Sequence, residues 1–107
     1  MHAQITYFRG PRSPQQVAAA EFAGHERVLP AVQALGRRFR GYRLLGADGT
    51  EIVISLADRE EDLLDMQKAI FATTLLPGED PALLTGPDSV ELFPVVEVFD
   101  VEGGQSS

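Results

Sequence analysis

The sequence of 107 residues contains no cysteine and no tryptophan. Without cysteine, disulfide bonds, thiolate nucleophiles and cysteine-ligated metal ions are excluded. No apolar run approaches the roughly 18 residues that span a bilayer, and the opening residues MHAQITYFRG lack the basic and apolar regions of a secretion signal. We therefore expect a cytoplasmic protein with no membrane partner, built as one domain over residues 1–102.

Basic residues are scarce beyond residue 43. Residues 1–43 hold seven arginines and two acidic residues, whereas residues 44–107 hold two basic and fourteen acidic residues, for a formal net charge of -7. An acidic chain repels polyanions unless a segregated basic face overrides the repulsion. An RNA-recognition domain would also need aromatic residues on its third strand, and EIVISLAD has none. We expect no nucleic-acid partner.

Strand and helix patterns alternate along the chain. Residues 3–9 predict a first strand, and residues 39–45 and 51–57 predict a hairpin around an Asp48-Gly49 turn. Residues 90–101 predict a last strand, in which Pro94 must lie at an edge, a bulge or a strand start.

A helix is predicted to begin at Pro14. Ser13, followed three positions later by Gln16, has the spacing of a capping box, and proline is favoured at the first helical position. Residues at helical spacing predict an inward-facing apolar stripe: Ala18, Phe22, His25, Leu29 and Val32. Pro30 predicts a kink or break at residues 26–30, and Gly36 predicts the C-terminal cap.

A second helix is predicted from Asp58, as its cap, to about Thr74. Its expected apolar side consists of Leu63, Met66, Ile70 and Phe71. The acidic residues of its first turns are expected to be solvated: Glu60, Glu61, Asp62 and Asp65. Residues 75–89 predict an ordered loop with one helical turn at residues 81–84, and residues 103–107 predict a disordered tail.

The element order predicts an α+β fold: a ferredoxin-like βαββαβ sandwich, with a four-stranded antiparallel sheet and two helices on one face. In the last strand both alternating sets of side chains are apolar, Leu92, Val96, Val98 on one side and Phe93, Val95, Phe99 on the other. A sheet solvated on one face would not show this pattern. We therefore expect a homodimer in which two sheets pack face to face, forming an α+β barrel.

The segment FRGYRLLGADGTEIVISLADREED, residues 39–62, resembles the second strand, hairpin, third strand and start of the second helix of antibiotic biosynthesis monooxygenase-type proteins. These belong to the dimeric α+β barrel superfamily, and the resemblance covers roughly residues 3–102. It implies a small oxygenase of phenolic or quinol-like molecules that uses no cofactor. Haem-degrading and functionally unassigned proteins share the same superfamily.

Two positions depart from that pattern. An aromatic residue, often tryptophan, commonly closes the third strand in the family, and the matching position here is Ala57. Haem-degrading relatives need a tryptophan and a histidine on the second helix, and REEDLLDMQKAIFATT has neither. Haem is therefore not expected.

Cofactor-free oxygenation needs a dry apolar pocket and a base for the phenolic proton. His25 is the candidate base, and the candidate pocket residues are Phe22, Tyr42, Arg43, Met66 and Ile70. No metal site is expected, because His25 has no partner ligand at suitable spacing. Alternatively, these residues are ordinary core residues, and the register of strand 39–45 leaves open whether Tyr42 faces the helices or a dimer interface.

The four arginines at 37, 38, 40 and 43 do not form one patch, because Arg40 and Arg43 point to opposite faces of a strand. For these two arginines, pairing with Glu51 across the hairpin or with acidic residues of a partner subunit is favoured over binding of a substrate anion. Two functions stay open: an enzyme acting on a small aromatic metabolite, and a non-catalytic dimeric ligand-binding or regulatory module.

Overall fold

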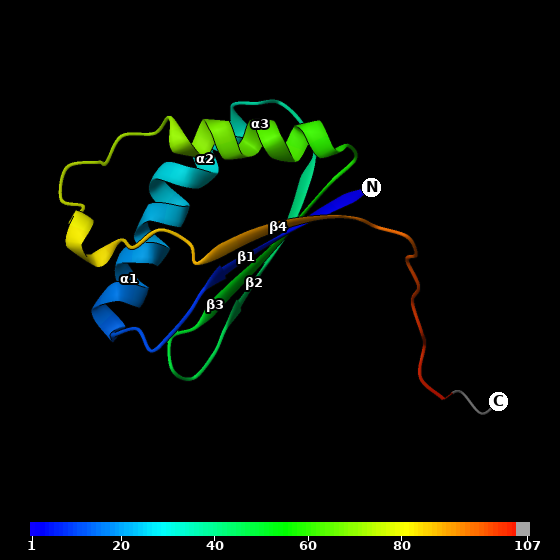
Figure 1. Cartoon of the computed structure of the whole chain (residues 1–107), viewed down its shortest axis with the longest axis horizontal. Helices are drawn as coiled ribbons and strands as arrows, with labels where there is room; N and C mark the ends of the chain where they lie inside the picture. The colour runs from blue at the N-terminus through cyan, green and yellow to red at the C-terminus, as the bar shows by residue number, and fades with distance from the viewer. Residues whose placement is uncertain (105–107) are drawn as a thin grey trace.

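The computed structural model describes residues 1–104, which form a four-stranded antiparallel sheet with helices over one face (Figure 1). The strands lie in the order β2-β3-β1-β4: β1 (His2–Phe8), β2 (Phe39–Leu45), β3 (Glu51–Ala57) and β4 (Ser89–Pro94). The predicted ferredoxin-like βαββαβ fold is confirmed. Residues 105–107 of the predicted tail lie outside the described residues. Within the described chain, no helix has the length and apolar character to cross a membrane.

The first helical region contains a wide turn. α1 (Pro14–Ala23) passes into a π-helical segment, η1 (Gly24–Val28), and then into α2 (Leu29–Gln33). In place of the predicted kink or break near residues 26–30, the structure has this π-helical segment, and the helix continues without a gap from Pro14 to Gln33. α2, which contains Pro30, directly follows the π-helical segment.

Both predicted ends of this helical region are confirmed. The Ser13 hydroxyl accepts a bond of 3.1 Å from the Gln16 N–H, and the Gln16 side chain accepts one of 2.8 Å from the Ser13 N–H. Gly36 follows α2 with a φ of 66°, a left-handed conformation that glycine adopts without strain.

The predicted inward stripe of the first helix is wrong for most of its members. Ala18, Phe22, His25 and Leu29 are exposed, whereas Ala23 is buried. One cause is η1, because a π-helical turn holds an extra residue and so rotates the following side chains around the axis. The other cause is position, since α1 lies against η1 and η2 (Pro81–Leu83) while α3 (Glu60–Phe71) lies on the sheet beside β1 and β3.

The start of α3 differs from the sequence prediction. Arg59 takes the extended N-cap position instead of Asp58, and no side chain caps the helix. Asp62 is not solvated but 5% exposed, because Arg37 and Arg59 donate to its Oδ1 at 3.2 and 3.3 Å. The helix ends at Phe71 instead of Thr74, and the Phe71 side chain is exposed. Arg37 also donates to Asp65, which lowers the pKa of that carboxyl.

The hydrophobic core is small and lies between α3 and one end of the sheet. Its buried members are Ala57, Leu63 and Met66, and half-buried residues pack against them: Val32, Leu35, Phe39, Ile70 and Leu92. On the same side of the sheet, Gln4 is buried and accepts a bond of 2.7 Å from Gln67 of α3. This bond identifies the face of the sheet that the helices cover.

The predicted last strand is too long. β4 ends at Pro94, because β1 begins at His2 and the Val95 N–H already donates to the Met1 carbonyl at 2.9 Å. Beyond Val95 no neighbouring strand continues, so residues 96–101 have no backbone to pair with in their own sheet. The alternation of side chains in the sequence predicts an extended segment, but it does not show where the neighbouring strand, β1, stops offering a backbone to pair with.

Arg12 connects the start of α1 to the predicted Asp48-Gly49 turn. Its backbone N–H donates to the Asp48 carbonyl at 2.9 Å, and its guanidinium donates to the Gly49 carbonyl at 2.7 Å. Gly49 has a φ of 88°, and a Cβ there would lie 2.7 Å from the Arg12 carbonyl oxygen. This close approach requires glycine.

Arg27 fixes the long loop between α3 and β4. Its guanidinium donates to Glu79 at 2.8 Å and to the Thr73 hydroxyl at 2.7 Å, while the Leu76 N–H also donates to Glu79 at 2.7 Å. The Glu79 side chain is 1% exposed. The Arg27 hydrogen bond, followed by the Leu76 N–H, lowers the pKa of Glu79. The loop is therefore ordered by one buried carboxylate.

Replacing Leu63 by alanine is expected to lower the free energy of unfolding by about 2–5 kcal/mol, because the side chain is fully buried and leaves a cavity. The control is Leu64→Ala, since the neighbouring leucine is 37% exposed and should cost less than half as much. Urea unfolding followed by circular dichroism measures both. Equal losses would show that Leu63 is not the centre of the core.

The lowered pKa of Glu79 makes a pH-dependent contribution to stability. A carboxyl with a depressed folded pKa stabilises the fold above its unfolded pKa, about 4.3 for glutamate, and this contribution disappears as the pH falls through the folded pKa. Glu79→Gln should therefore lower stability at pH 7 and make it less sensitive to acid below about pH 5. Glu60→Gln, an exposed helix-start residue, is the control in parallel urea titrations from pH 3 to 7. An unchanged acid dependence in Glu79→Gln would contradict this account.

Candidate functional site

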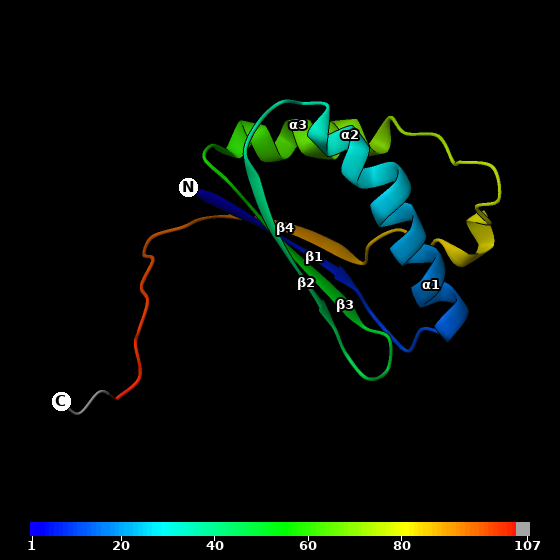
Figure 2. The ribbon, with the colours of Figure 1, turned by 180° about the vertical axis from the view of Figure 1, so that it is seen from behind.

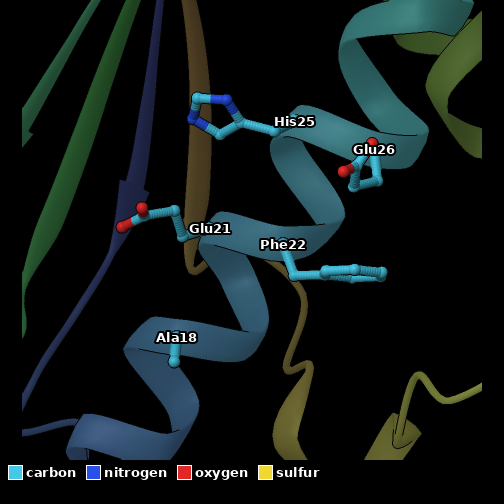
Figure 3. A pocket seen from close by; sticks show the side chains of 5 residues that line it. All are labelled: Ala18, Glu21, Phe22, His25 and Glu26. Atoms are coloured by element: carbon cyan, nitrogen blue, oxygen red, sulfur yellow. The ribbon is translucent and has the colours of Figure 1, made fainter.

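A hollow of about 340 Å³ lies along α1 and η1, lined by Ala18, Glu21, Phe22, His25 and Glu26. Glu21 and His25 project from the side of the helix that faces the strands, whereas Phe22 and Glu26 project to the other side (Figure 3). Glu21 and His25 are four residues apart, so they lie one above the other along the helix. The hollow thus presents a carboxylate and an imidazole to the sheet.

A chain of alternating charges runs from the β2–β3 hairpin to this hollow. Arg12 contacts Glu51 at 2.9 Å, Glu51 contacts Arg43 at 3.1 Å, and Arg43 reaches Glu21 of α1 at 3.6 Å. Pairing with Glu51 across the hairpin is predicted for either Arg40 or Arg43, and Arg43 is the one that makes it. The hydrogen bond to Glu51 is the largest cause that raises the pKa of Arg43, so this guanidinium keeps its charge.

The two ends of this chain differ in burial. The Arg12 and Glu51 side chains are 7% and 9% exposed, whereas Glu21 is 58% exposed. Arg12 also stacks over the Phe8 ring, 5.6 Å from its centroid. The inner pair is consequently a fixed structural element, while Glu21 is a loosely held partner that a ligand anion can replace.

The sheet around Arg43 is only partly covered by helix. Leu45 lies on the same face of β2 as Arg43 and is 49% exposed. Val90 shares this face and is 42% exposed, but it lies on β4, three strands away. Val53, directly opposite Arg43, is half-buried. Apolar surface and one cation therefore lie together on the side of the sheet that Glu21 and His25 face.

The structure brings together only part of the predicted site. Arg43 and His25 lie on the helix-covered side, and Phe22 lines the same hollow as His25 but points away from the strands. Tyr42 lies on the opposite face of the sheet, because adjacent residues of a strand alternate. Met66 and Ile70 belong to the core beneath α3.

Sequence reasoning did not identify Glu21. The available signal was its spacing of four from His25 on a predicted helix, combined with an arginine on a strand that such a helix covers. That signal needs the position of α1 relative to β2, which no local pattern provides.

A second hollow, of about 800 Å³, separates α1 from the loop before β4. Its apolar walls include Phe22, Leu83 and Leu84. The predicted helical turn in this loop is present as η2. Leu83 and Leu84 therefore line a space beside α1 and do not fill the core.

No group of three or more histidine or acidic side chains within residues 1–104 is arranged to hold a metal ion. No protein-family model matches the chain, and no curated protein is similar to it in sequence. The resemblance to the monooxygenase family remains an interpretation of residues 39–62, and function must be argued from the geometry of the site.

Proposed function

We propose that this protein binds a small phenolic or quinol-like molecule between α1 and the helix-covered face of the sheet, and that it oxygenates this molecule without a cofactor. The observation that supports the proposal is that His25 and Glu21 lie on the side of α1 that faces the sheet, where Arg43 lies beside Leu45 and Val53. A planar aromatic body matches these two apolar side chains, and a phenolate matches the guanidinium.

The chemistry needs few protein groups. The imidazole of His25 accepts the phenolic proton, and Arg43 stabilises the resulting phenolate. The electron-rich anion then reacts directly with oxygen. One oxygen atom enters the ring as a quinone carbonyl, and the other leaves as water with two hydrogens that the substrate loses, so the substrate itself supplies all the electrons. The phenolate takes the position of Glu21, whose contact with Arg43 is the most exposed of the charge chain.

One observation favours a non-catalytic ligand-binding module instead. His25 is exposed, and Phe22 is 46% exposed, so the hollow of a single chain is open to water. An oxygenase must keep water from its reactive anion. The two functions differ in one measurement, because a binding module changes the fluorescence of a bound phenol without consuming oxygen.

Replacing His25 by alanine is expected to lower oxygen consumption with quinol or anthrone-like substrates by about 100-fold or more, the usual contribution of a general base. His2→Gln is the control, because the only other histidine lies opposite Ala57 at the core end of the sheet. An oxygen electrode measures the rate under air. If the unmodified protein consumes no oxygen above the uncatalysed rate across such a panel, the enzymatic function is wrong.

We also propose that the protein is a homodimer through the face of the sheet that the helices leave open. The register assigns the side chains of this open face, which are apolar apart from Arg40, Ser89 and Glu91: Ala3, Ile5, Tyr7, Tyr42, Leu44, Ile52, Ile54, Leu56 and Phe93. Tyr42, Leu44 and Phe93 are each about half exposed in the single chain. An apolar face of this extent is typical of an interface.

The chain is less compact than a single domain of its length. It exposes 7475 Å², whereas a monomeric protein of this mass exposes about 5,800 Å², and its radius of gyration is 15.8 Å, against about 13 Å for a compact domain. The extended residues after β4 raise both values (Figure 1). Support for the dimer therefore comes from the apolar side chains of the open face.

Replacing Ile54 by lysine is expected to convert the dimer to a monomer, because Ile54 lies on a central strand of the open face and its charge would be buried against a second sheet. Glu60→Lys is the control for a charge change on an exposed helix. Sedimentation equilibrium at micromolar concentration gives the masses. A monomeric wild-type protein would contradict the dimer.

A further inference from the structure

The residues after β4 form an exposed apolar segment that does not contact the rest of its own chain as a strand. We define the C-terminal segment as residues 95–101. Its apolar side chains are Val95, Val96, Val98, Phe99 and Val101, of which Val96 and Val101 are 93% and 81% exposed. It leaves the end of β4 and extends away from the domain, on the side of the sheet opposite the helices (Figures 1 and 2).

The outer edge of β2 is an unpaired strand edge. β2 (Phe39–Leu45) is the first strand in the order β2-β3-β1-β4, so one side of its backbone has no neighbour in the sheet. It has seven residues, no proline, and no buried residue. Such an edge is a ready acceptor for an added strand. The C-terminal segment also spans seven residues and is extended.

Charges on the two segments are complementary at the same spacing. β2 carries Arg40 and Arg43, and the C-terminal segment carries Glu97 and Asp100. One antiparallel register places Arg40 opposite Asp100 and Arg43 opposite Glu97 together. The other pairs in that register are Phe39–Val101, Gly41–Phe99, Tyr42–Val98, Leu44–Val96 and Leu45–Val95, all of them apolar or glycine. A parallel register would also oppose the charges, as Arg40–Glu97 and Arg43–Asp100, but it would oppose Leu45 with Glu102.

We propose that the C-terminal segment of one copy adds as an antiparallel strand to the β2 edge of a second copy, in the register Arg40–Asp100. This inference rests on the proposed homodimer and specifies how the two copies exchange their C-terminal segments. Opposite residues of an antiparallel pair share a face, so Asp100, Val98 and Val96 join the open face, and Val101, Phe99, Glu97 and Val95 join the helix-covered face.

The segment cannot make these pairs within its own chain. Pro94, His2, Ala57 and Phe39 form one row across the sheet. Three strand spacings, about 14 Å, therefore separate Pro94 from Phe39. Leu45 lies six residues further along β2, about 20 Å, whereas adjacent Cα atoms are only about 3.8 Å apart. Val95 therefore cannot reach Leu45 of its own chain, and only a second copy satisfies the register.

The exchange would bring partner side chains to the candidate site. Phe99 of the second copy would cover Gly41, which lacks a side chain next to Arg43, and would supply an aromatic wall. Glu97 of the second copy would lie opposite Arg43, where it would compete with a ligand anion, as Glu21 does.

Engineered cysteines test the register, because the chain has none of its own. Tyr42→Cys combined with Val98→Cys places two thiols on directly opposed residues, whose Cα separation of about 4.5–5.5 Å suits a disulfide. Copper-phenanthroline oxidation should give a covalent dimer on a non-reducing gel. Tyr42→Cys with Phe99→Cys is the matched control and should stay monomeric on the gel, because Phe99 faces the other side. Each single-cysteine variant should also stay monomeric.

Each other outcome overturns the exchange. A covalent dimer from the Tyr42 and Phe99 pair would indicate the parallel register, and one from Val98→Cys alone would indicate that two C-terminal segments pair with each other. No cross-link in a protein that sediments as a dimer would remove the exchange but leave the dimer through the open face. A protein that sediments as a monomer would remove both proposals.

A charge reversal tests the same register without cross-linking. Arg40→Glu should raise the dimer dissociation constant by up to about five-fold, as expected for a cross-strand charge pair, and Asp100→Arg added to it should restore the wild-type value. Glu60→Arg added to Arg40→Glu is the control, because Glu60 is exposed at the start of α3 and belongs neither to the open face nor to the C-terminal segment. Failure of Asp100→Arg to restore dimerisation would overturn the Arg40–Asp100 pairing.

Discussion

A four-stranded sheet has two faces, and the helices of this chain cover only one of them. Even that face is covered unevenly, since the core of Ala57, Leu63 and Met66 lies at one end under α3. In a sheet with one solvated face, apolar side chains lie on the covered face and polar side chains on the solvated one. Here the arrangement is reversed. Gln4, Glu51 and Ser55 are buried on the helix-covered side, while the open side carries most of the β-branched and aromatic residues. This constraint underlies both the proposed dimer and the proposed ligand site.

The buried charges explain why α1 does not close over the hairpin end of the sheet. Burying an arginine and a glutamate is costly unless each is paired and hydrogen-bonded. Arg12 meets this condition through Glu51 and the Gly49 carbonyl, and Arg43 meets it through Glu51 and Glu21. An apolar helix face over these groups would remove the remaining water without offering further acceptors. The ion pairs thus keep a polar space between helix and sheet.

Most of the fold could be predicted from local patterns, because strand alternation, turn residues and helix caps depend on residues that are close together in the sequence. Alternation identified β1, β2 and β3, and the Asp48-Gly49 turn and the Ser13–Gln16 box have their expected bonds. The failures share a different cause. The end of β4 depends on where β1 begins, the burial of Asp62 depends on Arg37 from a distant loop, and the exposure of Phe22 depends on where α1 lies. None of these relations is contained in a window of neighbouring residues.

The candidate site was only partly predictable for the same reason. Alternation along β2 places Arg43 and Tyr42 on opposite faces, but only the bonds to Glu21 and Glu51 show which face meets the helix. His25 was identified by residue type, and Glu21 was missed because an exposed glutamate on a helix is ordinary in a sequence. Its significance comes from Arg43, which is 34% exposed between two carboxylates.

The unequal burial of those two carboxylates decides how an anion would enter the site. Removing one partner of a buried ion pair costs about 3–5 kcal/mol, whereas exposed pairs contribute about 0.2–1 kcal/mol. A phenolate, or the Glu97 carboxylate of a second copy, would therefore displace Glu21 and leave the Glu51 contact intact. The exposed Arg43–Glu21 contact is thus the point of the charge chain at which the proposed ligand anion would enter.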